Sequence, residues 1–235
     1  MQLTGPEILR RMQQPNPNNQ NNSPDIIIKP FDSKCLGSNS YDLHLGNTLG
    51  VYTTTVPYGM RPAIKYIPGR KYDMRDWFLN EDFYFDYLKN PQKYDIRNPQ
   101  YLLNPCNQKS NEITMFKIPT KGLILSPNIG YLGTTLEYTE THNLFPYIDG
   151  KSSVGRNFIS IHETAGRGDD GFCGQWTLEI TVKYATVVYP NMRIGQIYYE
   201  EFTGERKPYN VNPNSHYRGQ FGPTAAAPIP VEHIR

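Results

Sequence analysis

Short runs that alternate apolar and polar residues recur from residue 113 to residue 202, and they constrain the fold more than any other feature. Runs such as "GLILSP", "QWTLEITV" and "RIGQIYYEEF" are separated by turns rich in glycine and proline, with a new run about every 8–12 residues. Successive side chains of a strand point to opposite faces, so each run can bury one face. Many short strands with almost no helix favour a barrel or a sandwich. We therefore expect a mainly β fold.

The N-terminal part adds a short helix and further strands. The helix is expected to start with a capping box formed by Thr4 and Glu7, and strand-like runs follow within residues 25–56. Residues 58–112 are dense in Tyr, Asp, Asn, Arg and Pro and look like an insertion between two strand-rich halves, with a weakly periodic helical stretch. Residues 205–235 are rich in Pro, Asn and Gly and are expected to form a C-terminal lid or tail. The sequence thus predicts one domain over residues 1–235.

Composition and charge exclude several classes of function. The formal net charge of +2 is too balanced for a nucleic-acid coat or a polybasic membrane binder, and no apolar run approaches the roughly 20 residues of a membrane span. The N-terminus has no signal-peptide core. The 3 cysteines are scattered, which indicates reduced thiols. We expect a cytoplasmic protein that binds neither nucleic acid nor membrane.

One acidic residue stands in the middle of the strand-like run in "GDDGFCGQWTLEITV". Alternation places Trp176 and Leu178 on one face of this strand and Thr177 and Glu179 on the other. Glu179 is either a solvated charge on an exposed face or a buried group with a chemical role. Asp169 and Asp170, just upstream between glycines, would by default form a turn.

The segment "DGKSSVGR", residues 149–156, offers cations, hydroxyls and free amides within a short loop, a set that suits an anion such as phosphate. It is no P-loop, because Phe145 stands where that motif needs a glycine. The alternative is a polar loop with solvated Lys and Arg side chains. A zinc site is not expected: the histidines are dispersed, and neither HExxH nor the H-x-E with P-C-x-x-C pattern of zinc deaminases is present.

Five segments together resemble the dCTP deaminase family, a branch of the dUTPase-like trimers: "GSNSYDLHLG", "YLGTTLEYTETHNLFPYIDGKSSVGR", "IHETAGRGDDGFCGQWTLEI", "RIGQIYY" and "PYNVNPNSHYRGQ". The resemblance covers roughly residues 1–56 and 113–222 and leaves the insertion without a counterpart. It implies a distorted β-barrel or jelly roll of the dUTPase-like type. It also implies a homotrimer with active sites between subunits and Mg²⁺ held by the nucleotide triphosphate, without zinc.

The resemblance also implies roles for single residues. Glu179 resembles the catalytic base, assisted by Ser152 and Arg156, and Asp169 resembles the acid that faces the sugar. The residues implied in substrate binding are Lys151, Ser152, Ser153, Val154, Gly155, Arg156, Asp169, Thr177, Leu178, Glu179, Gln196, Tyr209, His216 and Gln220. Two departures stand out: Lys151 replaces a common Arg, and His216 replaces a common Lys.

The implied reaction is hydrolytic deamination of dCTP to dUTP and ammonia in pyrimidine deoxynucleotide metabolism, which supplies dUMP for thymidylate synthesis. dUTP and dTTP are related ligands. A single carboxylate can relay the protons of such a reaction when burial raises its pKa toward neutrality. The "TAG" segment with Ala165 and Gly166 resembles members that also hydrolyse the triphosphate to dUMP and pyrophosphate, in which the glycine would leave room for a second water beside the α-phosphate. This bifunctional reaction, a pure dUTPase and a non-catalytic nucleotide-binding regulator remain alternatives.

Overall fold

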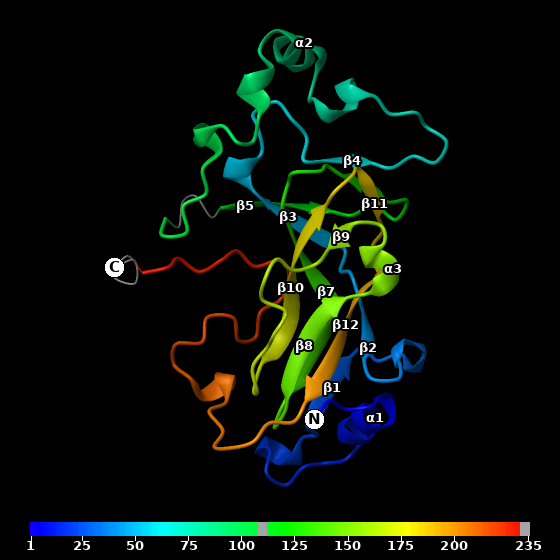
Figure 1. Ribbon diagram of the computed structural model, residues 1–235, viewed down its shortest axis with the longest axis vertical. Coiled ribbons are helices and arrows are strands. Elements are labelled where there is room, and N and C mark those ends of the chain that lie inside the picture. The colour runs from blue at the N-terminus through cyan, green and yellow to red at the C-terminus, as the bar shows by residue number, and fades with distance from the viewer. Residues whose placement is uncertain (108–111, 231–235) are drawn as a thin grey trace.

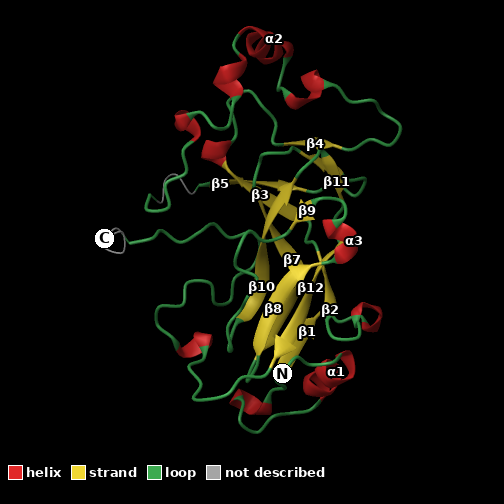
Figure 2. Ribbon diagram, in the orientation of Figure 1, coloured by secondary structure: helices red, strands yellow, loops and turns green. Residues whose placement is uncertain are grey.

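The structure is a computed structural model that describes residues 1–107 and 112–230 (Figures 1 and 2). Two short segments lie outside the described residues: 108–111 in the expected insertion and 231–235 in the expected tail. Strands form the middle of the elongated molecule, with α1 at one end and α2 at the other (Figure 1). The expectation of a mainly β fold built from curled antiparallel sheets is confirmed.

Within the described residues the strands form three antiparallel sheets. The largest runs in the order β5-β3-β7-β10-β9, with β1 paired to β7 as well. Its strands are β1 (Ile26–Lys29), β3 (Thr48–Tyr52), β5 (Ile113–Lys117), β7 (Tyr131–Thr141), β9 (Ile159–Ser160) and β10 (Cys173–Val182). The long pair β7–β10 forms the spine of this sheet, because both strands carry extended alternating sequence.

Two smaller sheets complete the body. One runs β2-β12-β8, with β2 (Tyr41–His44), β8 (Phe145–Gly150) and β12 (Arg193–Glu200). The other runs β11-β6-β4, with β4 (Ala63–Lys65), β6 (Leu123–Leu125) and β11 (Thr186–Val188). One core joins the three sheets, since Leu43, Leu125 and Leu178 each come from a different sheet and are almost fully buried. Burial of these side chains is the main force that holds the sheets together.

The helices are α1 (Gly5–Gln13), α2 (Glu81–Lys89) and the one-turn α3 (Ser152–Gly155). The expected capping box of α1 is wrong: the side chain of Thr4 makes no capping hydrogen bond, and Glu7 instead pairs with Arg10 and Arg11. The weakly periodic stretch of the insertion does contain a helix, α2, which starts after Asn80 as its N-cap. None of the helices described in residues 1–107 and 112–230 is long and apolar enough to cross a membrane.

The alternation expected for β10 is confirmed along its whole length. Trp176 and Leu178 are buried in the core, whereas Thr177 and Glu179 are half-buried on the opposite face. On one side β10 pairs with β7 from Cys173 to Ile180, but β9 covers its other edge only at Thr181 and Val182. The N-terminal half of that edge is therefore free to receive another segment of the chain, beside the face that carries Glu179.

Candidate functional site

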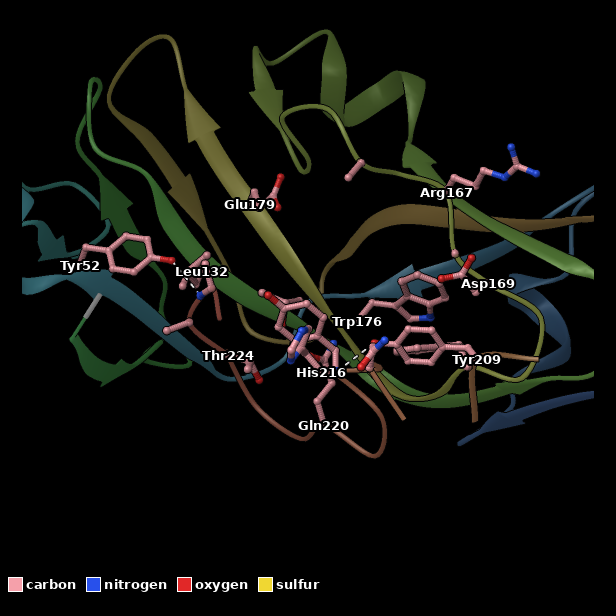
Figure 3. Close-up of a pocket in the computed structure, with 18 residues that line it drawn as sticks. Tyr52, Leu132, Arg167, Asp169, Trp176, Glu179, Tyr209, His216, Gln220 and Thr224 are labelled. Carbon is pink, nitrogen blue, oxygen red and sulfur yellow. Dashed lines mark hydrogen bonds between the residues drawn. The ribbon is translucent and has the colours of Figure 1, made fainter. Parts of the chain in front are cut away.

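An open cleft of about 470 Å³ lies along this half of β10 (Figure 3). Three parts of the chain form most of its lining: β10 itself, the loop that precedes β10, and the tail. Tyr52 of β3 and Leu132 of β7 complete it. Of the residues implied by the sequence, it brings together Asp169, Thr177, Glu179, Tyr209, His216 and Gln220, together with Ala165. Figure 3 shows Tyr209, His216 and Gln220 on one side of the cleft and Glu179 across from them.

Glu179 is held in a fixed position by the loop that precedes β10. Its Oε2 accepts a hydrogen bond of 2.9 Å from the backbone N–H of Glu163, and its own N–H donates to the carbonyl of Ile161 at 2.9 Å. Its Oε1 has no hydrogen-bond partner among the described residues. In the single chain the side chain is half-buried, so the expected full burial is not provided by this chain alone. A partly open carboxylate with one free oxygen can reach a substrate or a water molecule.

Two buried polar atoms in the cleft have no hydrogen-bond partner within residues 1–107 and 112–230: Oγ1 of Thr177 and Oε1 of Gln220. A buried polar atom without a partner costs free energy, so such atoms mark places where a ligand can donate or accept. Leu178, which was also expected to contact the substrate, has its side chain in the core and is 1% exposed. Only its backbone could take part in binding.

The loop before β10 places its side chains on two sides. Asp169 is exposed and lines the cleft, whereas the neighbouring Asp170 is buried. Arg167 points away from Glu179 (Figure 3), with its guanidinium 4.6 Å from the centre of the Phe145 ring. Although it borders the cleft, its charge is therefore directed away from the carboxylate of Glu179.

Gly166 packs closely against the backbone of β8, which leaves no room for a side chain. Its carbonyl accepts a 2.7 Å hydrogen bond from the N–H of Ile148, and a Cβ added here would lie 2.4 Å from the Ile148 carbonyl oxygen and 3.2 Å from Nε2 of His162. The sequence suggested that this glycine leaves room for a second water molecule beside a phosphate. In this chain the space in the direction of a side chain is already filled, so the loop needs glycine for its path.

Gly166→Ala is expected to lower the free energy of unfolding by about 1–3 kcal/mol, because the loop must move away from β8 to admit the methyl group. Thermal denaturation measures the change. Gly130→Ala is the matched control, since a Cβ at Gly130 meets no atom within 4 Å. Equal melting temperatures for the two variants would contradict the packing argument.

The tail covers the free edge of β10. Gln175 donates from its N–H to the carbonyl of Gln220 at 3.0 Å, Gln220 returns a 2.8 Å bond from Nε2 to the Gln175 carbonyl, and the N–H of Gly219 donates to the Cys173 carbonyl at 2.8 Å. Phe221 stacks on Tyr138 with ring centres 5.6 Å apart. Burial raises the pKa of Tyr138, and its hydrogen bond to a neighbouring glutamate adds to this, so an uncharged phenol ring meets Phe221.

Residues 151–156, the expected phosphate loop, lie outside the cleft. Ser152, Ser153, Gly155 and Arg156 are exposed around α3, whereas the Val154 side chain is buried in the core. Nζ of Lys151 lies 2.8 and 2.9 Å from the two carboxylate oxygens of Asp42. In Figure 1, α3 lies on one side of β10 and the tail on the other.

Gln196, expected to approach the nucleotide, also lies outside the cleft. Its Oε1 accepts a 3.0 Å hydrogen bond from Oγ of Ser40, and its Nε2 donates to the Gly150 carbonyl at 3.4 Å. One chain therefore carries the implied site as two separate surfaces: the cleft beside β10, and the turn formed by residues 150–156 after β8.

Sequence reasoning missed several residues near the cleft. Tyr52 and Thr224 line it, but they come from β3 and from the far end of the tail, and no local pattern connects either segment to Glu179. Asp170 was expected only as a turn former, yet it is 5% exposed and pairs with Arg206. Within the described parts of the chain, no group of three or more His, Cys, Asp or Glu side chains is placed to hold a metal ion.

Comparisons with known proteins agree on one family. A family model described as dCTP deaminase-like matches residues 70–202, a range that includes most of the expected insertion. Proteins named "dCTP deaminase, dUMP-forming" are similar to the chain. The one from Leptospira biflexa is 36% identical over 89% of this chain and 87% of its own length. The one from Cytophaga hutchinsonii is 34% identical, covering 83% and 85%. The one from Clostridium beijerinckii is 34% identical, covering 94% and 93%.

Two solved structures also align with the chain. The 2'-deoxycytidine 5'-triphosphate deaminase from Agrobacterium tumefaciens has a TM-score of 0.48 at 16% identity, over 84% of this chain and 47% of that one. The native EIAV dUTPase has a TM-score of 0.30 at 19% identity, over 39% of this chain and 84% of that one.

Proposed function

The chain belongs to the dCTP deaminase family, and on this premise we propose that it deaminates dCTP and releases dUMP. The observation that carries the proposal is a half-buried glutamate, Glu179, in a cleft with unpartnered polar atoms, within a chain 34–36% identical to dUMP-forming dCTP deaminases. The sequence favoured dUTP as the product and kept dUMP as the alternative. The names of these relatives favour the alternative.

In the first step, water adds to C4 of the cytosine ring and the 4-amino group leaves as ammonia, giving the uracil ring. Over this step water gives up both of its protons, one to N3 and one to the departing amine, and Glu179 relays them through its free Oε1. Thr177, with its unpartnered Oγ1, would bind the ring, and Asp169 would bind the deoxyribose. In the second step, another water cleaves the α–β phosphoanhydride of dUTP, giving dUMP and pyrophosphate.

The distribution of charge supports an oligomer. Among the described residues that line the cleft, Arg167 is the one Arg or Lys, and its guanidinium points away from Glu179. A triphosphate needs cations and N–H donors, and the exposed turn at 150–156 offers them on a different surface of the chain. We infer a homotrimer in which this turn of one subunit completes the cleft of its neighbour, with Ser152 and Arg156 placed beside Glu179. The same contact would bury Glu179 further.

Magnesium fits the proposal as part of the substrate. Mg²⁺ prefers phosphate oxygens and water to an all-protein cage, so the nucleotide triphosphate would bring it to the cleft. Chelation with EDTA would then weaken dCTP binding, and added Mg²⁺ would restore it.

Incubation of the purified protein with dCTP and Mg²⁺, followed by separation of the nucleotides by ion exchange, tests the function. We expect ammonia, pyrophosphate and dUMP, with no accumulation of free dUTP. Accumulation of dUTP without dUMP would show that the protein only deaminates dCTP and does not hydrolyse the triphosphate. Hydrolysis of added dUTP with dCTP left intact would instead support a dUTPase, and nucleotide binding without turnover would support a regulator.

A further inference from the structure

We propose that Asp170 is a positioning residue that latches the start of the tail to the body and so holds the tail over the cleft. The inference rests on the proposed function, because it assigns the latch a role in binding dCTP. It does not concern the chemistry at Glu179. The described residues that carry it are Asp170 itself, Asn143, Arg206 and Tyr209.

The latch is a buried carboxylate held from two directions. Nε of Arg206 lies 2.8 Å from Oδ2 of Asp170, and Nη2 of Arg206 lies 3.1 Å from Oδ1, so the pair is bidentate. From the body, the N–H of Asn143 donates to Oδ1 at 2.7 Å. The Asp170 side chain is 6% exposed and that of Arg206 is 33% exposed. Bidentate, charge-assisted hydrogen bonds to a desolvated carboxylate are among the strongest polar contacts that a surface segment can make.

The backbone of the same residue holds the tail a second time. The carbonyl of Asp170 accepts a 2.7 Å hydrogen bond from the N–H of Tyr209. Tyr209 then organises the residues that follow: its hydroxyl accepts from the N–H of Tyr217 at 2.9 Å, and its carbonyl accepts from Oγ of Ser215 at 2.6 Å. The position of His216, a cleft residue that lies between Ser215 and Tyr217, therefore depends on the anchor at Asp170.

The turn that carries the latch also approaches the tail closely. Gly171 has a φ of +85, in the left-handed region, and a Cβ there would lie 2.8 Å from Oδ1 of Asn210 and 3.0 Å from Cβ of Pro208. On the other side of Asp170, Asp169 is exposed in the cleft. The two adjacent aspartates thus have different roles. Asp169 faces the ligand, and Asp170 anchors the segment that covers the ligand.

Loss of the latch should weaken substrate binding more than turnover, because β10 and Glu179 are held by other contacts. For Arg206→Gln we expect the KM for dCTP to rise about tenfold, as for the loss of one charge-assisted contact, and kcat to change by less than about threefold. Arg206→Lys keeps the positive charge but loses the bidentate geometry of the guanidinium. Its KM should therefore lie between those of the wild type and Arg206→Gln.

Lys207→Gln is the matched control. It removes the adjacent exposed cation, which forms none of the ion pairs found among the described residues, and should leave KM unchanged. The second readout is cleavage of the tail by chymotrypsin at Tyr217 and Phe221, which does not depend on activity. We expect faster cleavage in Arg206→Gln and wild-type cleavage in Lys207→Gln.

The two readouts separate the latch from the proposed function. An unchanged KM together with unchanged tail cleavage in Arg206→Gln would overturn the latch. Equal effects of Arg206→Gln and Lys207→Gln would also overturn it, because they would indicate a general effect of charge. If the wild-type protein does not turn over dCTP but the tail of Arg206→Gln is released, the function proposal fails and the anchoring of the tail stands.

Discussion

Glu179→Gln is expected to lower the rate of dCTP deamination by about 10²–10⁴-fold, the usual contribution of a general acid–base group. The amide keeps the size of the side chain and can still accept the hydrogen bond from the N–H of Glu163, so the loop before β10 should keep its position. It cannot take a proton from water at C4. Binding of dCTP and the melting temperature should stay close to those of the wild type, as measured by calorimetry and thermal denaturation.

Glu163→Gln is the matched control for this variant. Glu163 is the neighbouring acid, but its carboxylate accepts from Oγ1 of Thr181 at 3.2 Å, and only its backbone contacts Glu179. The control should deaminate dCTP within a few-fold of the wild-type rate. A Glu179→Gln enzyme that retains more than about a tenth of the wild-type rate would refute the assignment of Glu179 as the base.

Mixed trimers of two inactive variants should regain activity, because the proposed site takes Glu179 from one subunit and Arg156 from the next. Arg156→Ala should lose about 10²–10³-fold in rate, since it removes a charged contact to the reacting substrate. When Arg156→Ala and Glu179→Gln chains assemble at random, half of the clefts contain Glu179, and half of those face a neighbour with Arg156. About one quarter of all sites should then be complete, which is about one third of the sites in the trimers that contain both variants.

Co-expression of the two variants with different affinity tags, followed by tandem purification, isolates the mixed trimers for the assay. Native mass spectrometry verifies their composition. The control is the double variant Arg156→Ala/Glu179→Gln co-expressed with either single variant, which cannot form a complete site. Mixed trimers that stay inactive would show that both residues must belong to one chain, and a stable monomer with full activity would exclude the shared site.

The strands were predictable wherever the sequence alternates without interruption. In β10 and β12, apolar and polar residues alternate, because one face of each strand packs on the core and the other does not. β8 was missed as a strand. Its sequence, "FPYIDG", contains Pro146 and ends in polar residues, and it becomes a strand because β12 pairs with it in register from Glu200 to Gly195.

The capping pattern at the start of α1 misled because a different contact was stronger. Thr4 before the helix and Glu7 in its first turn suit a capping box. Glu7 is near Arg10 and Arg11 on the same helix, however, and pairs with these cations instead. Val154 and Leu178 were expected to contact the substrate as parts of contiguous motifs, and that expectation stays a prediction for their backbones. Their side chains point into the core because neighbouring residues in a turn or strand face different environments.

The sequence by itself determined which chemical groups this protein possesses: an isolated glutamate on the polar face of a strand, and a short loop of cations and hydroxyls. Both follow from residue type and period, which are local properties. Only the tertiary structure decided that Glu179 and Arg156 lie on different surfaces of one chain, and that Asp169 faces the cleft while Asp170 anchors the tail. Two adjacent aspartates are equivalent in sequence, and their roles diverge because Asn143 and Arg206, distant along the chain, approach only one of them.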